Sequence, residues 1–392
     1  MNNAMTIINK MNIRLRQDGR YEGRITIEDK RKCFYGKTKT EVKNKAKEYL
    51  LKVENGYKEP QKIILNDYIE YWLKKYKYTR IEPSSYTRLY RVYECQIKPT
   101  IGTKYIGQVT TKDIQKLIDE FANPTKKQTK PLAKSGLKKI IQLLRPCMDK
   151  AVNEGIIQEN PCSNVILPTD SYIKTETKQQ ITLSDVEINV FRDLCLMKYK
   201  NGEYKSRDAI VLLIILNLGL RVGEMLALEW KDVDFENRIV YIRRTIQSNI
   251  VDFSGDNRKI FDRVKDSTKT KSGERVLSLN DTTIWYFKEL QEYDKRKGIK
   301  SVCITSSNTG TRKSARNMQR SLNRIIKDSE LPQEMTLHTL RHTFGSALIR
   351  RGVGIEVVSK LMGHANITIT YLKYIHVLQE QEAKTMQMIR IC

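Results

Sequence analysis

The pattern of hydrophobic and polar positions begins with the period of β-strands and then changes to that of a helix. Residues 12–35 alternate between apolar and polar side chains in three short runs separated by turns. Thr38 and Glu41 then have the T-x-x-E spacing of a helix capping box, and apolar residues follow at three- and four-residue steps. The segment 1–58 is therefore predicted to form a three-stranded sheet followed by one helix.

Residues 63–160 show helical periodicity almost throughout. Apolar residues recur at three- and four-residue steps in four successive stretches, the last of which contains Pro146. A proline inside a helix removes a backbone hydrogen bond, so this helix is expected to be kinked or shortened there. The next segment, 161–180, is polar, contains two prolines and lacks periodicity, which is typical of a linker between domains.

From residue 181 to residue 392 the pattern predicts a larger, mixed α/β domain. Helical stretches flank two alternating runs, "RIVYIRRTIQ" at 238–247 and "GERVLSL" at 273–279, which are expected to pair as strands of a small sheet. The lysines of "TKTKSG", just before the second run, are expected to lie at a hairpin. The whole chain is thus predicted to be multidomain and mainly α-helical, with small β-sheets.

The charge of the chain indicates a polyanionic partner. The 71 Lys and Arg residues outnumber 45 Asp and Glu, for a formal net charge of +26, which favours nucleic acid or an acidic membrane surface. The most apolar run, at 209–220, is too short to span a bilayer, so DNA is the preferred partner. Residues 1–60 alone hold 15 basic and 8 acidic residues, a balance that suits a sheet in a DNA groove or, alternatively, a solvated basic face.

The cysteines predict a reduced, cytoplasmic protein. All seven are scattered, and none forms a C-x-x-C pair, which argues against a zinc finger, a disulfide framework and a redox motif. The first residues also lack the apolar stretch of a secretory signal.

All four histidines lie within 39 consecutive residues, which makes this window a candidate site. Two chemistries suit such a window. His338 and His342 are four apart and, on a helix, can present two imidazoles to one metal ion. No glutamate lies between them, however, and no carboxylate or cysteine nearby in sequence offers a third ligand, so metal binding is disfavoured.

Phosphoryl transfer without a metal fits the window better. Arginine can grip two phosphate oxygens and stays charged, lysine or histidine can protonate a leaving oxygen, and a phenol can form a covalent ester. The window holds Arg341 and two tyrosines, Tyr371 and Tyr374, and their spacing on a helix also suits simple packing.

Several motifs together resemble the tyrosine recombinases, the lambda-integrase family. "HTLRH" at 338–342, "LMGH" at 361–364 and "YIHV" at 374–377 resemble its C-terminal signature, and "NEGIIQENP" resembles the end of its core-binding domain. "LGLRVGEMLALEW" resembles its first arginine box and "TKTKSGERVLSL" its hairpin lysine segment.

The resemblance implies a domain order: an arm-type DNA-binding domain over 1–58, a helical, SAM-like core-binding domain over 63–160, a linker over 161–180 and a catalytic domain over 181–392.

The resemblance also implies roles for individual residues. Arg221 and Arg341 would clamp the scissile phosphate, although an ordinary ion pair of Arg221 with Glu224 is the alternative. Glu224 matches the family's supporting acid. Lys271, with Lys269 as the alternative, would protonate the 5′ oxygen as it leaves. The four histidines complete the set. His338 would serve in proton transfer and His364 in a phosphate hydrogen bond, whereas His342 and His376 would make structural or backbone contacts.

The same family pattern separates the two tyrosines. Its nucleophile lies nine or ten residues after the histidine of "GH" and begins a short "Y-x-H" run. Tyr374 is ten residues after His364 and begins "YIHV", whereas Tyr371 is only seven residues after it. Tyr374 is therefore the expected nucleophile and Tyr371 a packing neighbour.

The function implied is that of a phage or conjugative-transposon type integrase, which cuts and rejoins DNA through a 3′-phosphotyrosyl intermediate. It implies no metal or other cofactor, double-stranded DNA with core and arm sites as substrate, and a homotetramer on that DNA. An excisionase and a host DNA-bending protein are candidate accessory partners, and no membrane is involved. Two alternatives remain open: a type IB topoisomerase-like nicking-closing enzyme, and a non-catalytic DNA-binding regulator on the same scaffold.

Overall fold

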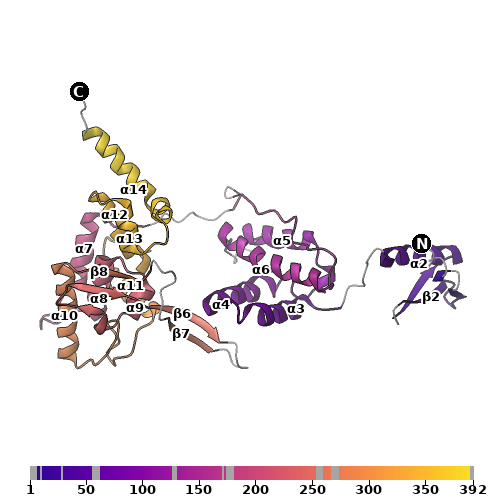
Figure 1. The fold of residues 1–392 in the computed structure, drawn as a ribbon, viewed down its shortest axis with the longest axis horizontal. Coiled ribbons are helices and arrows are strands. Elements are labelled where there is room, and N and C mark those ends of the chain that lie inside the picture. Colours follow the sequence, from indigo (N-terminus) through magenta and orange to yellow (C-terminus); the bar gives the residue numbers. More distant parts are fainter. Residues whose placement is uncertain are drawn as a thin grey trace. The chain divides into compact units, whose positions relative to one another are not determined.

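The computed structural model divides the chain into two compact units, Met1–Glu176 and Thr177–Cys392 (Figure 1). The structure describes residues 7–8, 11–27, 30–54, 62–125, 130–169, 172–173, 181–252, 259–265 and 273–388.

The first unit begins with the predicted sheet and helix. Three antiparallel strands pair in the order β1-β2-β3 and are followed by helix α2, which packs Val42, Ala46 and Leu50 onto the sheet. Their bounds are β1 Asn12–Leu15, β2 Tyr21–Ile27, β3 Lys30–Gly36 and α2 Lys39–Glu54. Thr38 Oγ1 accepts the N–H of Glu41 as expected, but the Glu41 carboxylate accepts from the backbone N–H of Lys37 rather than from Thr38.

The remainder of the first unit is helical, as the periodicity predicted. The elements are α3 Leu65–Trp72 with the π-helical turn η1 Leu73–Lys77, α4 Pro83–Val92 with η2 Tyr93–Ile97, the 3₁₀ turn η3 Ile106–Gln108, α5 Thr111–Ala122 and α6 Lys134–Asn153. Helix α6 continues for seven residues beyond Pro146, so the proline does not end it.

The second unit is built around helix α8, Arg207–Leu218, of which eleven residues are buried. Helices α7, α10, α11 and α12 pack against it. The helices of this unit are α7 Asp185–Cys195, α8, α9 Val222–Ala227, the 3₁₀ turn η4 Trp230–Asp232, α10 Asp281–Lys297, α11 Ala315–Ile326, α12 Leu337–Arg350, α13 Ile355–Met362 and α14 Ile367–Met388. Within the described residues, no helix combines the length and apolarity that a membrane crossing requires.

The strands of the second unit confirm one predicted pairing and correct another expectation. Strands β4 Val233–Asp234, β5 Ile239–Ile242 and β8 Arg275–Ser278 form an antiparallel sheet in the order β4-β5-β8. The run "RIVYIRRTIQ", expected to be one strand, is two, because β6 Thr245–Asp252 leaves this sheet and pairs with β7 Lys259–Lys265. Lys269 and Lys271 lie outside the described residues.

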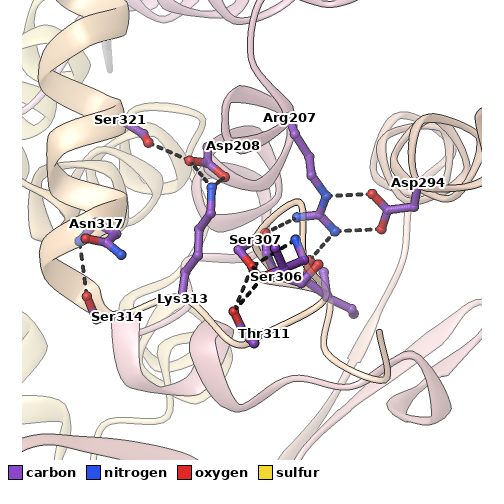
Figure 2. Close-up of polar contacts among 12 residues, drawn as sticks. Arg207, Asp208, Asp294, Ser306, Ser307, Thr311, Lys313, Ser314, Asn317 and Ser321 are labelled. Atoms are coloured by element: carbon purple, nitrogen blue, oxygen red, sulfur yellow. Dashed lines mark hydrogen bonds and ion pairs between the residues drawn. The ribbon is translucent and has the colours of Figure 1, made fainter. Parts of the chain in front are cut away.

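Two buried ion networks fix the N-terminal end of α8 (Figure 2). Arg207 donates to both carboxylate oxygens of Asp294 at 2.6 Å, and also to the carbonyls of residues 304 and 306. Its neighbour Asp208 accepts from Lys313 Nζ at 2.6 and 2.7 Å and from Ser321 Oγ at 2.5 Å. A buried charge that loses its partner is strongly destabilising, so these pairs have to stay together in the folded protein. They therefore hold α8 against α10 and α11.

Candidate active site

The C-terminal end of α8 provides the first contact of the site. Gly219 ends the helix in the left-handed conformation, with φ of 58°. A Cβ at this position would lie 2.7 Å from Cε1 of Phe344 on α12, so only glycine permits both the turn and the close approach. The Gly219 carbonyl accepts a hydrogen bond from Arg341 Nη1 at 2.7 Å. Arg341, 4% exposed, donates through Nη2 to the carbonyl of Met362 at 2.5 Å.

Arg221 follows two residues after Gly219, at the N-terminus of α9. Its Nη1 donates to Glu224 Oε1 at 2.6 Å and its backbone N–H to Glu224 Oε2 at 2.9 Å. Its Nη2 donates to the Gly363 carbonyl at 2.6 Å. The ordinary ion pair considered from the sequence is therefore present. The side chain nevertheless remains 35% exposed, so solvent reaches it.

Arg275, on strand β8, joins the same cluster and was not singled out from the sequence. Its Nη1 and Nη2 donate to the two carboxylate oxygens of Glu224 at 3.2 and 3.0 Å, and its Nε donates to the Leu361 carbonyl at 2.8 Å. Three arginines thus donate to three consecutive carbonyls, 361, 362 and 363, at the C-terminal end of α13. That end of a helix carries partial negative charge, which favours bound cations.

The charges of this cluster perturb one another. Burial acts to raise the pKa of Glu224, but the adjacent Arg275 and Arg221 outweigh it and hold the pKa below its usual value. Burial, together with the positive charge of Arg221, lowers the pKa of Arg341 to about 9. Arg341 therefore stays charged at neutral pH, but in surroundings already crowded with cations, and such a site favours an anion between the guanidinium groups.

The histidines are held neutral near the arginines. Burial, followed by the charge of Arg341, lowers the pKa of His364 to about 3, and its Nδ1 lies 2.7 Å from Thr370 Oγ1. Desolvation by neighbouring atoms and the charge of Arg341 also lower the pKa of His338, at the start of α12, although its side chain still reaches solvent. Burial and the charge of Lys373 lower the pKa of His342 to about 4. Among the described residues, no group of three or more His, Cys, Asp or Glu side chains could hold a metal ion.

Tyr374 is fully buried beside this cluster. Its hydroxyl lies 3.5 Å from Met362 Sδ and 3.4 Å from His342 Nδ1, so His342, expected to be structural, contacts the phenol. Burial raises the pKa of Tyr374 well above its usual value. Tyr371, expected to be a packing neighbour, is instead 48% exposed.

The structure therefore brings together most of the side chains proposed from the sequence. Those that converge on the region between the end of α8 and helices α12, α13 and α14 are Arg221, Glu224, His338, Arg341, His364 and Tyr374. Lys271, its alternative Lys269 and the side chain of His376 lie outside the described residues.

Lys373 is a further cation at this site that sequence reasoning missed. Burial and the charges of Arg341 and Arg221 lower its pKa, and its own charge acts on the neighbouring histidines. Its place on α14, three residues after Thr370 and next to Tyr374, was a usable signal, because residues three apart share a helix face.

The chain is similar to known proteins over most of its length. Residues 188–381 match the phage integrase family, and residues 64–122 match the phage integrase N-terminal SAM-like domain. The chain is 29% identical over 373 residues to a tyrosine recombinase XerC-like protein of Caldanaerobacter subterraneus subsp. tengcongensis, covering 91% of this chain and 90% of that protein. It is 24% identical over 345 residues to the integrase of Staphylococcus phage L54a, covering 83% and 90%.

Solved structures show the same fold. The Tn1549 transposon integrase in complex with transposon right end DNA superposes with a TM-score of 0.61 at 19% identity, over 82% of this chain and 99% of that one. A lambda integrase tetramer bound to a Holliday junction gives 0.58 at 16% identity, over 92% and 94%.

Proposed function

This chain belongs to the phage integrase family of tyrosine recombinases, and from that membership we propose that it is a site-specific DNA recombinase, an integrase that inserts and excises a mobile element. The observation that carries the proposal is the position of Met362. Its carbonyl accepts from Arg341 and its Sδ contacts the Tyr374 hydroxyl. One residue thus joins a candidate phosphate-binding guanidinium to a candidate nucleophile.

The chemistry follows from these positions. Arg221 and Arg341 bind the non-bridging oxygens of the scissile phosphate and balance the charge that develops on them. The Tyr374 oxygen attacks phosphorus and the bond to the 5′ oxygen breaks, which leaves a 3′-phosphotyrosyl ester and a free 5′ hydroxyl. His338, held neutral, accepts the phenolic proton, and Lys271 protonates the leaving oxygen. Attack by a 5′ hydroxyl from the partner strand reverses the step and rejoins the DNA.

The resting phenol is not yet placed for attack. Tyr374 is fully buried against Met362 and Gly345, and a buried phenol with a raised pKa is a poor nucleophile. Binding of DNA must therefore be accompanied by a movement of α14 that carries Tyr374 from this pocket to the phosphate. A protein that hides its nucleophile in this way avoids cutting DNA before the complex has assembled.

The recombinase acts on double-stranded DNA as a multimer. We assign the basic sheet of residues 12–36 to arm sites and helices α3–α6 to core sites, and a homotetramer to the exchange of strands between two duplexes. An excisionase and a host DNA-bending protein would set the direction of the reaction, which would take place in the bacterial cytoplasm.

A nicked suicide duplex carrying the core site of the element tests the proposal. Cleavage releases a short 5′-hydroxyl strand by diffusion, so the covalent protein–DNA adduct accumulates and is seen on a denaturing gel. Wild type is expected to form the adduct, Tyr374→Phe to form none and Tyr371→Phe to form it normally. No wild-type adduct would favour a DNA-binding regulator, and an undiminished adduct with Tyr374→Phe would refute the assignment of the nucleophile.

The same reaction separates recombination from simple nicking and closing. A recombinase joins strands between two duplexes that each carry the site, whereas a type IB topoisomerase-like enzyme relaxes supercoils and gives no joint product.

A further inference from the structure

We propose that Arg275 is a positioning residue for DNA cleavage, which keeps Arg221 available to the scissile phosphate by balancing the buried charge of Glu224. The inference rests on the recombinase function proposed above and adds a residue to its mechanism. Arg275 is not itself a phosphate ligand, because its side chain is only 7% exposed and its guanidinium is occupied by protein oxygens.

The geometry shows two guanidinium groups sharing one carboxylate. Glu224 is 1% exposed and receives Arg221 Nη1 at 2.6 Å on Oε1, while Arg275 contacts both of its oxygens. The third arginine, Arg341, lies 4.0 Å from Oε2. Glu224 orients Arg221 through these contacts, and Arg275 donates hydrogen bonds to the acceptor positions of the carboxylate that Arg221 leaves free.

The balance of charge explains why a third arginine is needed. Glu224 alone would neutralise one of the two phosphate-binding arginines, because an ion pair buried in protein is strong. Arg275 supplies a compensating charge, so the group of three arginines and one glutamate keeps a net of two positive charges. Without Arg275 this net falls to one, while the phosphate and its transition state still need their charge balanced.

Arg275 also fixes the shape of the cluster. Its Nε donates to the Leu361 carbonyl at 2.8 Å, next to the carbonyls that receive Arg341 and Arg221. Its Nη1 donates to the carbonyl of Gly273 at 3.1 Å, which holds the start of β8 against the same site. The planar guanidinium makes these contacts at once, a geometry that lysine cannot reproduce.

A simple structural role is the competing explanation, and Arg244 provides a matched control. Arg244 is also a poorly exposed arginine of the second unit, 16% exposed, that joins two carboxylates, those of Glu229 at 2.9 Å and Asp232 at 2.5 Å. None of these groups belongs to the proposed catalytic set. Loss of either arginine should lower stability, but only loss of Arg275 should change the chemistry of the folded protein.

The test compares Arg275→Gln, Arg275→Lys and Arg244→Gln in full-length protein on suicide duplexes. Each is assayed on a normal duplex and on one with a methylphosphonate at the scissile position, where a methyl group replaces a charged non-bridging oxygen. Adduct formation is followed at saturating protein and at a temperature where thermal melting shows every variant folded. DNA affinity is measured separately by fluorescence anisotropy and is expected to stay close to that of wild type.

Arg275→Gln is expected to slow cleavage of the normal duplex on the order of 10- to 100-fold, less than the roughly 100- to 1,000-fold typical of losing a group in direct contact with the developing charge. On the methylphosphonate its rate should approach that of wild type, because less charge has to be balanced. Arg275→Lys keeps the charge and should show a smaller defect without that recovery. Arg244→Gln should cleave like wild type on both duplexes.

Two results would overturn the inference while leaving the proposed function intact. One is a wild-type cleavage rate in Arg275→Gln, and the other is a defect of Arg275→Gln that has the same size on the two duplexes. Should Arg275→Gln fail to fold, Arg275→Lys decides: a wild-type rate in a variant that has lost the forked contacts contradicts the positioning role. Absence of any adduct with wild-type protein would instead refute the recombinase function, and the inference with it.

Discussion

Replacing Gly345 with alanine tests whether the resting phenol is held in its pocket by close packing. Gly345 lies inside α12, and a Cβ there would be 2.5 Å from Cζ of Tyr374 and 3.0 Å from Met362 Sδ. Both distances are shorter than atoms in contact tolerate, and the ring is rigid. The ring must therefore move if Gly345→Ala is to fold.

The magnitudes set the sign of the effect. Alanine in a helix interior is favoured over glycine by about 1 kcal/mol. Keeping the ring in the overpacked pocket costs about 1–3 kcal/mol. Moving it into solvent instead loses a similar free energy of apolar burial. Subtracting the gain in helix propensity leaves a net destabilisation of about 0–2 kcal/mol, equivalent to a fall in melting temperature of up to about 8 °C for a domain of this size. The gain in helix propensity is the same whether the ring is in the pocket or out of it, so the full overpacking cost acts on this equilibrium. The population with Tyr374 released should therefore rise about 5- to 150-fold.

Nitration with tetranitromethane followed by tryptic mass spectrometry measures this release. Trypsin cuts after Lys373, so Tyr374 and the half-exposed Tyr371 fall in different peptides and Tyr371 serves as an internal reference. Gly136→Ala in α6 is the control, because a Cβ there would meet its nearest neighbour at 3.3 Å. An unchanged nitration of Tyr374 in Gly345→Ala, with a melting temperature raised by the gain in helix propensity, would refute the packing argument.

Three further predictions concern other parts of the chain. Asp294→Asn should destabilise the second unit by about 3–5 kcal/mol in urea unfolding, because the buried Arg207 loses its charged partner. Asp281→Asn, at an exposed ion pair, should change the free energy of unfolding little, and equal losses in the two variants would contradict the argument. The folded pKa of His364, about 3, lies below its unfolded value of 6.5, so its contribution to stability is full above pH 6.5 and is lost as the pH falls toward 3. His364→Gln should therefore flatten the curve of unfolding free energy against pH in this range. An unchanged slope would show that His364 is not held neutral. Hydrogen bonds and charge from the surrounding arginines lower the pKa of Glu22 to about 2, so its carboxylate partly neutralises the positive charge of the sheet. Glu22→Gln should therefore strengthen non-specific DNA binding and steepen its salt dependence. Weaker binding would mean that the carboxylate instead orients the arginines.

Local patterns predicted the elements well, and the errors have physical causes. The period of apolar residues located the sheet of the first unit and the helices of both units, because burial of one face fixes such a pattern. It could not divide residues 238–247 into two strands, because β5 and β6 continue the same alternation and differ only in their partners. Pro146 did not end α6, in which Leu143, Leu144, Cys147 and Met148 are all buried around it.

The residues of the candidate site were predictable where they belong to a sequence motif. They were not predictable where their role depends on a contact with a residue far away in sequence. Arg275 lies 51 residues from Glu224 in sequence, and no motif indicates that the two pair. A weak signal existed, because Arg275 shares a strand face with the buried Leu277, and an inward-facing arginine needs a carboxylate. The burial of Tyr374 depends on Gly345, a contact between helices that no motif of either segment shows.

The site and the ion networks of α8 use opposite ends of one helix, so the first end can be weakened without a change at the site. Arg207 and Asp208 fix the first turn, while Gly219 follows the last turn and meets Arg341. A helix of twelve residues is about 18 Å long, well beyond the range of about 7–10 Å within which substitutions usually influence one another. Loosening the first end should therefore lower the fraction of folded molecules, whereas the role we propose for the arginines at the other end is to set how fast each folded molecule cuts DNA.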